Sequence, residues 1–150
     1  MIANFAETLV ARMPDALIYA DRDGVIRVWN AGAVRMFGHS AAEAIGQGLD
    51  LIIPAALRER HWAGFRETMR TGQTRYGEGQ ILSVPALTKN GARISVAFTI
   101  VPFTDAAGAM TGIAAIMRDA TAQFEETRAL RKEIAALRQA ADAPAGRSPA

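Results

Sequence analysis

Apolar side chains recur every three or four residues in three stretches of the chain, and this spacing predicts amphipathic helices. The first stretch is residues 1–13, the second lies between Pro54 and Gly72, and the third is residues 120–141. Proline suits the first turn of a helix, and glycine suits the position just after its end. The central helix is therefore expected between these two residues, with an apolar stripe of Leu57, His61, Phe65 and Met69.

Other segments have the alternating or β-branched pattern of strands. Gly24 and the Asn90-Gly91 pair mark turns between them. Pro85 favours a position at the edge of the sheet, because proline has no N–H to give to a neighbouring strand. The predicted strands are residues 16–20, 25–30, 75–87, 93–101 and 111–119.

Two short helices are predicted between the second and third strands. The first covers residues 31–38, and the second begins at Ser40, where Glu43 three residues later completes a capping box. Two strands, several short helices and three further strands predict an α+β fold. We expect a five-stranded antiparallel sheet with short helices on one face, formed by residues 14–119.

The C-terminal helix has the seam of a short coiled coil. Its apolar positions are spaced alternately by three and four residues, with isoleucine in an a-type position and leucine in d-type positions. This combination favours a parallel homodimer, although the same face could instead pack back on the sheet. Residues 142–150 contain two prolines and a glycine and are expected to be a disordered tail. The seam consists of Thr127, Leu130, Ile134, Leu137 and Ala141.

The composition limits the classes of function. The 150 residues are 50% hydrophobic, which is enough for the core of one domain. The net charge is only +2, and no block of like charges suggests nucleic-acid binding. The chain has no cysteine, which excludes disulfides, thiolate metal sites and cysteinyl chromophore adducts. No apolar run approaches the ~18 residues of a membrane span, and no signal peptide is visible. We expect a cytoplasmic protein without a membrane partner.

His61 is the residue best placed for chemistry, because it lies on the apolar face of a helix. A neutral imidazole in that position can coordinate a metal. It can equally be a half-buried histidine that is hydrogen-bonded to a neighbour. His39 precedes the capping box and is expected to be exposed, with no assigned role.

Several motifs together resemble the PAS family, a sensory and signalling fold. The hairpin at residues 21–26 followed by Trp29-Asn30 resembles the family's first hairpin and its asparagine. Residues 36–46 resemble the short-helix motif, with His39 replacing the usual aromatic residue. Lys89-Asn90-Gly91 and residues 112–121 resemble the closing strands and the exit into a signalling helix. The resemblance covers about residues 13–121.

A narrower resemblance is to the haem-binding PAS domains of the FixL type and to related oxygen-sensing phosphodiesterases. Their histidine ligand lies on the central helix, seven residues after a proline, as His61 follows Pro54 here. The resemblance implies haem b held by His61. Gln80 or Arg75 would be the nearest equivalents of the distal residue. The walls of the pocket would be Leu57, Phe65 and Met69 on the helix and Ile94, Val96, Phe98, Ile113 and Ile116 on the sheet.

Two functions are open at this point. In the first, the domain is a haem sensor of a diatomic gas or of redox state, which signals through the C-terminal helix to a dimer or to a partner acting in trans. In the second, it is a dimerisation or protein-interaction module with no cofactor or with a small ligand. No nucleophile–base pair or phosphate-binding loop supports an enzyme, so we expect no catalytic activity.

Overall fold

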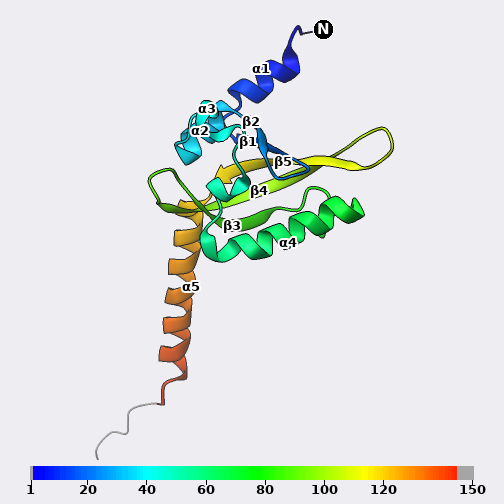
Figure 1. Cartoon of the computed structure of the whole chain (residues 1–150). Coiled ribbons are helices and arrows are strands. Elements are labelled where there is room, and N and C mark those ends of the chain that lie inside the picture. Colours follow the sequence, from blue (N-terminus) through cyan, green and yellow to red (C-terminus); the bar gives the residue numbers. More distant parts are fainter. Residues whose placement is uncertain (1, 145–150) are drawn as a thin grey trace, which may run out of the picture. The chain divides into compact units, whose positions relative to one another are not determined.

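The computed structural model describes residues 2–144, and its helices and strands are drawn in Figure 1. The chain divides into two compact units, one ending at Asp119 and the other beginning at Ala120. We call the first the core unit and describe α5 by itself. The elements are α1 (Phe5–Arg12), β1 (Ala16–Asp21), β2 (Ile26–Trp29), α2 (Ala31–Phe37), α3 (Ala41–Ala44), the 3₁₀ helix η1 (Leu49–Leu51), α4 (Ala55–Thr71), β3 (Leu82–Leu87), β4 (Arg93–Thr104), β5 (Met110–Asp119) and α5 (Thr121–Asp142).

The strands form one sheet in the order β2-β1-β5-β4-β3, and each neighbouring pair is antiparallel. The predicted five-stranded antiparallel sheet is confirmed. β3 lies at one edge, as Pro85 indicated. Gly24 has a φ of 79° and Gly91 a φ of 84°, and a left-handed backbone of this kind favours glycine at a turn. Both predicted turns are therefore confirmed.

One face of the sheet is buried beneath the helices of the core unit. On β1 the buried positions alternate, and each lies directly opposite a residue of β5 that faces the same core. Figure 1 shows α4 running along the sheet, with α2 and α3 nearer to β1 and β2. The largest side chains that are almost completely buried in the core unit are Ile18, Ile26, Phe37, Val96 and Met110.

Ile116 does not share this face with Ile113. Successive side chains of a strand point to opposite faces, so residues three apart lie on different faces. Ile113 packs against the buried Phe65 and Met69, whereas Ile116 lies opposite Leu17 on the other face. The prediction that both isoleucines line one wall is wrong for Ile116.

The expectation that His39 is exposed is also wrong. Its side chain is only 12% exposed. The ring lies edge-on to Trp29, with 6.3 Å between the ring centroids, and Nδ1 is 3.9 Å from the Glu43 carboxylate. The His39 carbonyl accepts a hydrogen bond of 3.0 Å from Trp29 Nε1. The contacts with Trp29, ten residues earlier on β2, therefore leave this side chain largely covered.

Some element boundaries differ from the predicted ones. The third strand begins at Leu82 rather than at residue 75, because the glycine-containing segment before it forms a loop. Pro54 occupies the N-cap of α4 rather than its first turn, and Gly72 follows the last turn with a φ of 72°. The last helix extends to Asp142, one residue into the predicted tail. The rest of that tail from residue 145, and Met1 of the first predicted helix, lie outside the described residues.

Asn30 ties three elements of the core unit together and is itself 6% exposed. Its Oδ1 accepts hydrogen bonds from the backbone N–H groups of Leu17 at 2.8 Å and Ala33 at 3.0 Å. Its Nδ2 donates to the carbonyls of Val10 at 2.9 Å and Asp15 at 3.1 Å. A single side chain therefore satisfies polar groups of α1, β1 and α2 and of the connection between α1 and β1.

We predict that Asn30→Ala lowers the free energy of unfolding by about 3 kcal/mol, because it leaves buried backbone groups without partners. Urea denaturation measures the change. Gln47→Ala removes an exposed amide and serves as the control, with an expected change below about 0.5 kcal/mol. Equal stabilities of the two variants would contradict the structural role of Asn30.

Candidate functional site

The candidate site is built on the inner face of α4. Phe65 and Met69 are buried, whereas Leu57 and His61 are half-buried, so the predicted apolar stripe does face inward. Phe65 and Met69 form a cluster with Met110 of β5. A helix of this length draws most of its stability from such packing rather than from intrinsic propensity.

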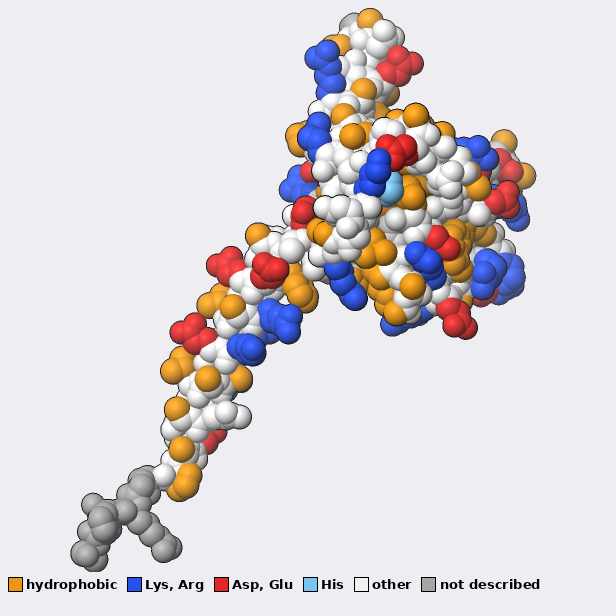
Figure 2. Space-filling model, turned by 60° about the vertical axis from the view of Figure 1, so that its left-hand side comes forward, with side chains coloured by type: hydrophobic (Ala, Val, Ile, Leu, Met, Phe, Trp, Pro, Cys, Tyr) orange, Lys and Arg blue, Asp and Glu red, His pale blue; other side chains and the backbone are white. Residues whose placement is uncertain are grey.

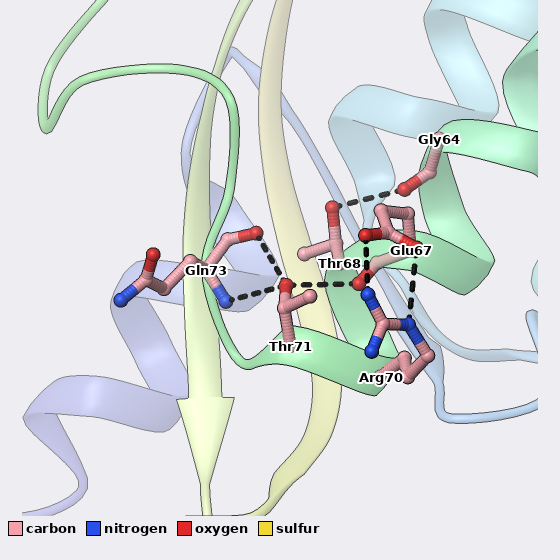
Figure 3. A network of polar contacts seen from close by, with 6 residues as sticks. All are labelled: Gly64, Glu67, Thr68, Arg70, Thr71 and Gln73. Atoms are coloured by element: carbon pink, nitrogen blue, oxygen red, sulfur yellow. Dashed lines mark hydrogen bonds and ion pairs between the residues drawn. The ribbon is translucent and has the colours of Figure 1, made fainter.

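The C-terminal end of α4 is fastened by polar contacts on its outer surface (Figure 3). The Thr68 hydroxyl donates to the Gly64 carbonyl at 3.0 Å, and the Thr71 hydroxyl donates to the Glu67 carbonyl at 2.9 Å. Arg70 contacts both carboxylate oxygens of Glu67, at 2.7 and 3.2 Å. These groups are exposed and contribute little stability. Thr71 Oγ1 also lies 3.2 Å from both the N–H and the carbonyl of Gln73, and these contacts reach beyond the last turn of the helix.

His61 lies among aromatic rings. Its centroid is 4.8 Å from the Trp62 ring, which stands edge-on to it, and 6.0 Å from the Phe65 ring. Its Nδ1 is buried and has no hydrogen-bond partner among the described residues. A buried polar atom without a partner is uncommon in folded proteins. His39 Nε2 has the same property, so this feature supports a role for His61 only together with its place on the inner face of α4.

The surroundings of His61 favour its neutral form. Burial lowers the pKa of its imidazole below the ordinary value of 6.5, and the negative charge of Asp50 partly opposes this effect. Removing a cationic imidazolium from water costs free energy, which is why burial has this sign. A neutral imidazole has a free lone pair, so the lowered pKa favours the form of His61 that can coordinate a metal.

Sequence patterns did not identify Asp50 and Trp62 as part of the site, although both contact or influence His61. Trp62 Nε1 donates a hydrogen bond of 2.6 Å to Asp50 Oδ1. Trp62 also stands edge-on to Phe65, with 5.3 Å between ring centroids. The only available signal was a tryptophan next to the histidine, and such a neighbour predicts no contact with a residue twelve positions earlier.

The predicted pocket walls are divided between two clusters. Ile113 packs with Phe65 and Met69, in the cluster nearest to His61. The β4 residues Ile94, Val96 and Phe98 belong to the main core instead.

The predicted distal residues lie on the surface of the loop between α4 and β3. Gln80 Oε1 accepts a hydrogen bond of 3.0 Å from the Gly77 N–H, and its side chain is exposed. The Arg75 guanidinium lies 5.7 Å from the centroid of the Tyr76 ring and is also exposed. The structure therefore does not bring Gln80 or Arg75 together with His61.

The core unit has a hollow of about 620 Å³ away from His61. It is lined by none of the predicted site residues. The residues that line it include Ala6, Val10, Arg27, Trp29 and Ile45.

Neither a metal cluster nor a membrane-spanning helix is found within residues 2–144. No three His, Cys, Asp or Glu side chains in this range are grouped closely enough to hold a metal ion. None of its helices combines the length and apolar character needed to cross a bilayer.

A family model described as the PAS fold matches residues 10–125. The chain belongs to the PAS family. Solved PAS domains have the same fold: one from Colwellia psychrerythraea superposes with a TM-score of 0.67 at 22% identity, covering 77% of this chain and 94% of that one. The PAS domain of BvgS from Bordetella pertussis gives a TM-score of 0.61 at 20% identity, covering 89% and 96%.

Among curated relatives, the sensor protein FixL of Bradyrhizobium diazoefficiens is 39% identical over 54 residues, which cover 36% of this chain. The oxygen sensor protein DosP of Escherichia coli is 30% identical over 129 residues, which cover 84% of this chain. The match spans 11% of the length of FixL and 16% of that of DosP. The PAS domain described here is accordingly a sensory module that corresponds to a small part of these longer proteins.

We predict that His61 in the cofactor-free protein titrates below pH 6.5. The unfolded chain then binds the proton more readily than the folded one, so the free energy of unfolding should fall as the pH drops from 6.5 towards the lowered pKa. NMR titration of the imidazole protons measures the pKa, and the signal missing from His61→Gln identifies the residue. A pKa of His61 above 6.5 would contradict the environment described here.

Proposed function

We propose that this PAS domain binds haem b through His61 and senses a diatomic gas or a change of redox state. The observation that carries the proposal is the place of this imidazole, which faces inward beside the rings of Trp62 and Phe65, with a pKa lowered by burial and no partner at Nδ1 among the described residues. The spacing of His61 from Pro54 also supports the proposal, because it equals the spacing between proline and histidine ligand in the haem-binding PAS domains that this chain resembles. The name of DosP, an oxygen sensor, points in the same direction.

His61 and its apolar neighbours would suit the proximal side of a haem group. A porphyrin needs one axial ligand and apolar walls. His61 would supply the ligand, and the packed cluster of Phe65, Met69 and Ile113 would have to open to line the porphyrin with apolar surface. Leu57 is half-buried one helical turn before His61. Gln80 and Arg75 could act on the distal side only if the loop between α4 and β3 is rearranged.

Haem, when bound, would supply an iron centre that binds a diatomic gas or changes oxidation state. The protein would hold it on the imidazole of His61 and shield it from water with the apolar cluster. β5 is the strand that contacts this cluster, and the chain passes from its last residue, Asp119, into α5 within two residues. A displacement of β5 therefore has a direct covalent route to the signalling helix.

We predict that the purified or haem-reconstituted protein has a Soret band that shifts with CO, and that His61→Ala abolishes saturable haem binding. His39→Phe is the matched control, since the chain has two histidines and the other one is buried against Trp29. This control should bind haem like the wild type, as measured by titration in visible absorption.

Unchanged haem affinity in His61→Ala would contradict the assignment of the ligand. No saturable haem uptake by the wild type would instead support the second function, a PAS interaction module without a cofactor or with a small ligand. His61 would then be a structural residue of the core.

We also propose that α5 forms a homodimer through its apolar seam. In the described structure Leu130 is 51%, Ile134 48% and Leu137 63% exposed. Figure 2 shows apolar side chains along this helix between charged ones of both signs. Large apolar side chains at these spacings gain free energy when a second helix covers them.

We predict that Leu130→Lys with Leu137→Lys makes the protein monomeric, because two charges would be buried in the seam. Multi-angle light scattering measures the mass. Ala129→Lys with Ala136→Lys places the same two charges one heptad apart on the outer side of the helix, and this control should stay dimeric. Equal masses of the two double variants would contradict the seam as the interface.

A further inference from the structure

The indole of Trp62 is held by three elements of the core unit at once. Its Nε1 donates to Asp50 Oδ1 of η1 at 2.6 Å. Its six-membered ring lies so close to Gly24, in the turn between β1 and β2, that a Cβ at this position would overlap the ring. Its backbone belongs to α4. The side chain therefore has little freedom to rotate.

The Asp50 carboxylate is itself well positioned. Arg58 of α4 donates from Nη2 to the Asp50 carbonyl at 3.3 Å and from Nε to the Ile53 carbonyl at 3.0 Å. The same Nε lies 3.9 Å from Asp50 Oδ1. The first turn of α4 thus holds η1, and η1 presents the carboxylate to the indole one turn further along the helix.

The position of Trp62 matters for His61. Adjacent residues of a helix point about 100° apart, so an unrestrained Trp62 could turn away from its neighbour. Here the indole stands edge-on to the His61 imidazole at 4.8 Å and edge-on to Phe65 at 5.3 Å. It shields one side of the imidazole and limits the rotation of that ring.

We propose that Asp50 and Trp62 are positioning residues of the His61 site: the Asp50 carboxylate fixes the indole, and the indole fixes the orientation of the imidazole towards its ligand. This inference rests on the proposed function. Neither residue is itself a proposed ligand of the haem. Their effect is to keep the imidazole in the orientation that binds, so that less conformational freedom is lost when a ligand is bound.

Three variants test the inference. Asp50→Leu removes the acceptor, Trp62→Phe removes the donor, and Asp50→Asn is the matched control, because its amide oxygen still accepts the hydrogen bond. Asp50 is half-exposed, so its variants are expected to fold, which circular dichroism checks. In the haem-loaded protein, we expect Asp50→Leu and Trp62→Phe to raise the haem dissociation rate about tenfold. They should also shift the iron–imidazole stretching band in resonance Raman spectra, whereas Asp50→Asn should stay within about threefold of the wild-type rate.

A second readout uses the protein without haem. The NMR signal of the Trp62 indole N–H and the ring-current shifts of the His61 protons should move in Asp50→Leu and stay near the wild-type values in Asp50→Asn. If the wild type takes up no haem, the proposed function fails, and these signals still decide whether Asp50 and Trp62 orient His61. Equal signals and equal dissociation rates in Asp50→Leu and Asp50→Asn would overturn the inference.

Discussion

The packing of α4 on β5 is the contact on which the site depends. Phe65 and Met69 lie against Met110 and Ile113, and they bury the apolar stripe of the helix. Each fully buried side chain of this size contributes about 2 kcal/mol relative to an exposed one. Because His61 lies on the same stripe, this packing also removes its imidazole from water. The lowered pKa of the candidate ligand is therefore a consequence of this packing.

The turn between β1 and β2 also bears on the site. A left-handed backbone at Gly24 makes that turn, and the absence of a side chain there leaves room for the indole of Trp62. The hairpin is in turn fixed by Asp21, whose carboxylate accepts hydrogen bonds from the Asp23 and Val25 N–H groups. A single glycine thus serves both the strand connection and the surroundings of His61.

Features that depend on neighbouring residues in the chain were predicted correctly from the sequence. The stripe of α4, the glycine after its last turn, the capping box at Ser40 and the edge position of Pro85 all follow from spacing and backbone preference. Contacts between distant segments were missed. His39 is buried by Trp29, and Trp62 is held by Asp50; neither contact leaves a periodic signal.

Two wrongly placed site residues show where prediction from the sequence failed. Ile116 was placed with Ile113 in one wall of the pocket implied by the resemblance, whereas the two-residue period of a strand places them on opposite faces. Gln80 was assigned by its place after the central helix, but it closes a turn with Gly77 on the surface of a loop. Loops follow weaker rules than helices and strands, so the distal side of the site was the least predictable part.

The most direct measurement is the resonance Raman spectrum of the ferrous, haem-loaded His39→Phe variant, grown with ¹⁴N- or ¹⁵N-labelled histidine. His61 is the only histidine of this variant. We predict an iron–imidazole stretching band that moves to lower frequency with the heavier isotope. Bound haem without a band sensitive to this label would contradict coordination by His61.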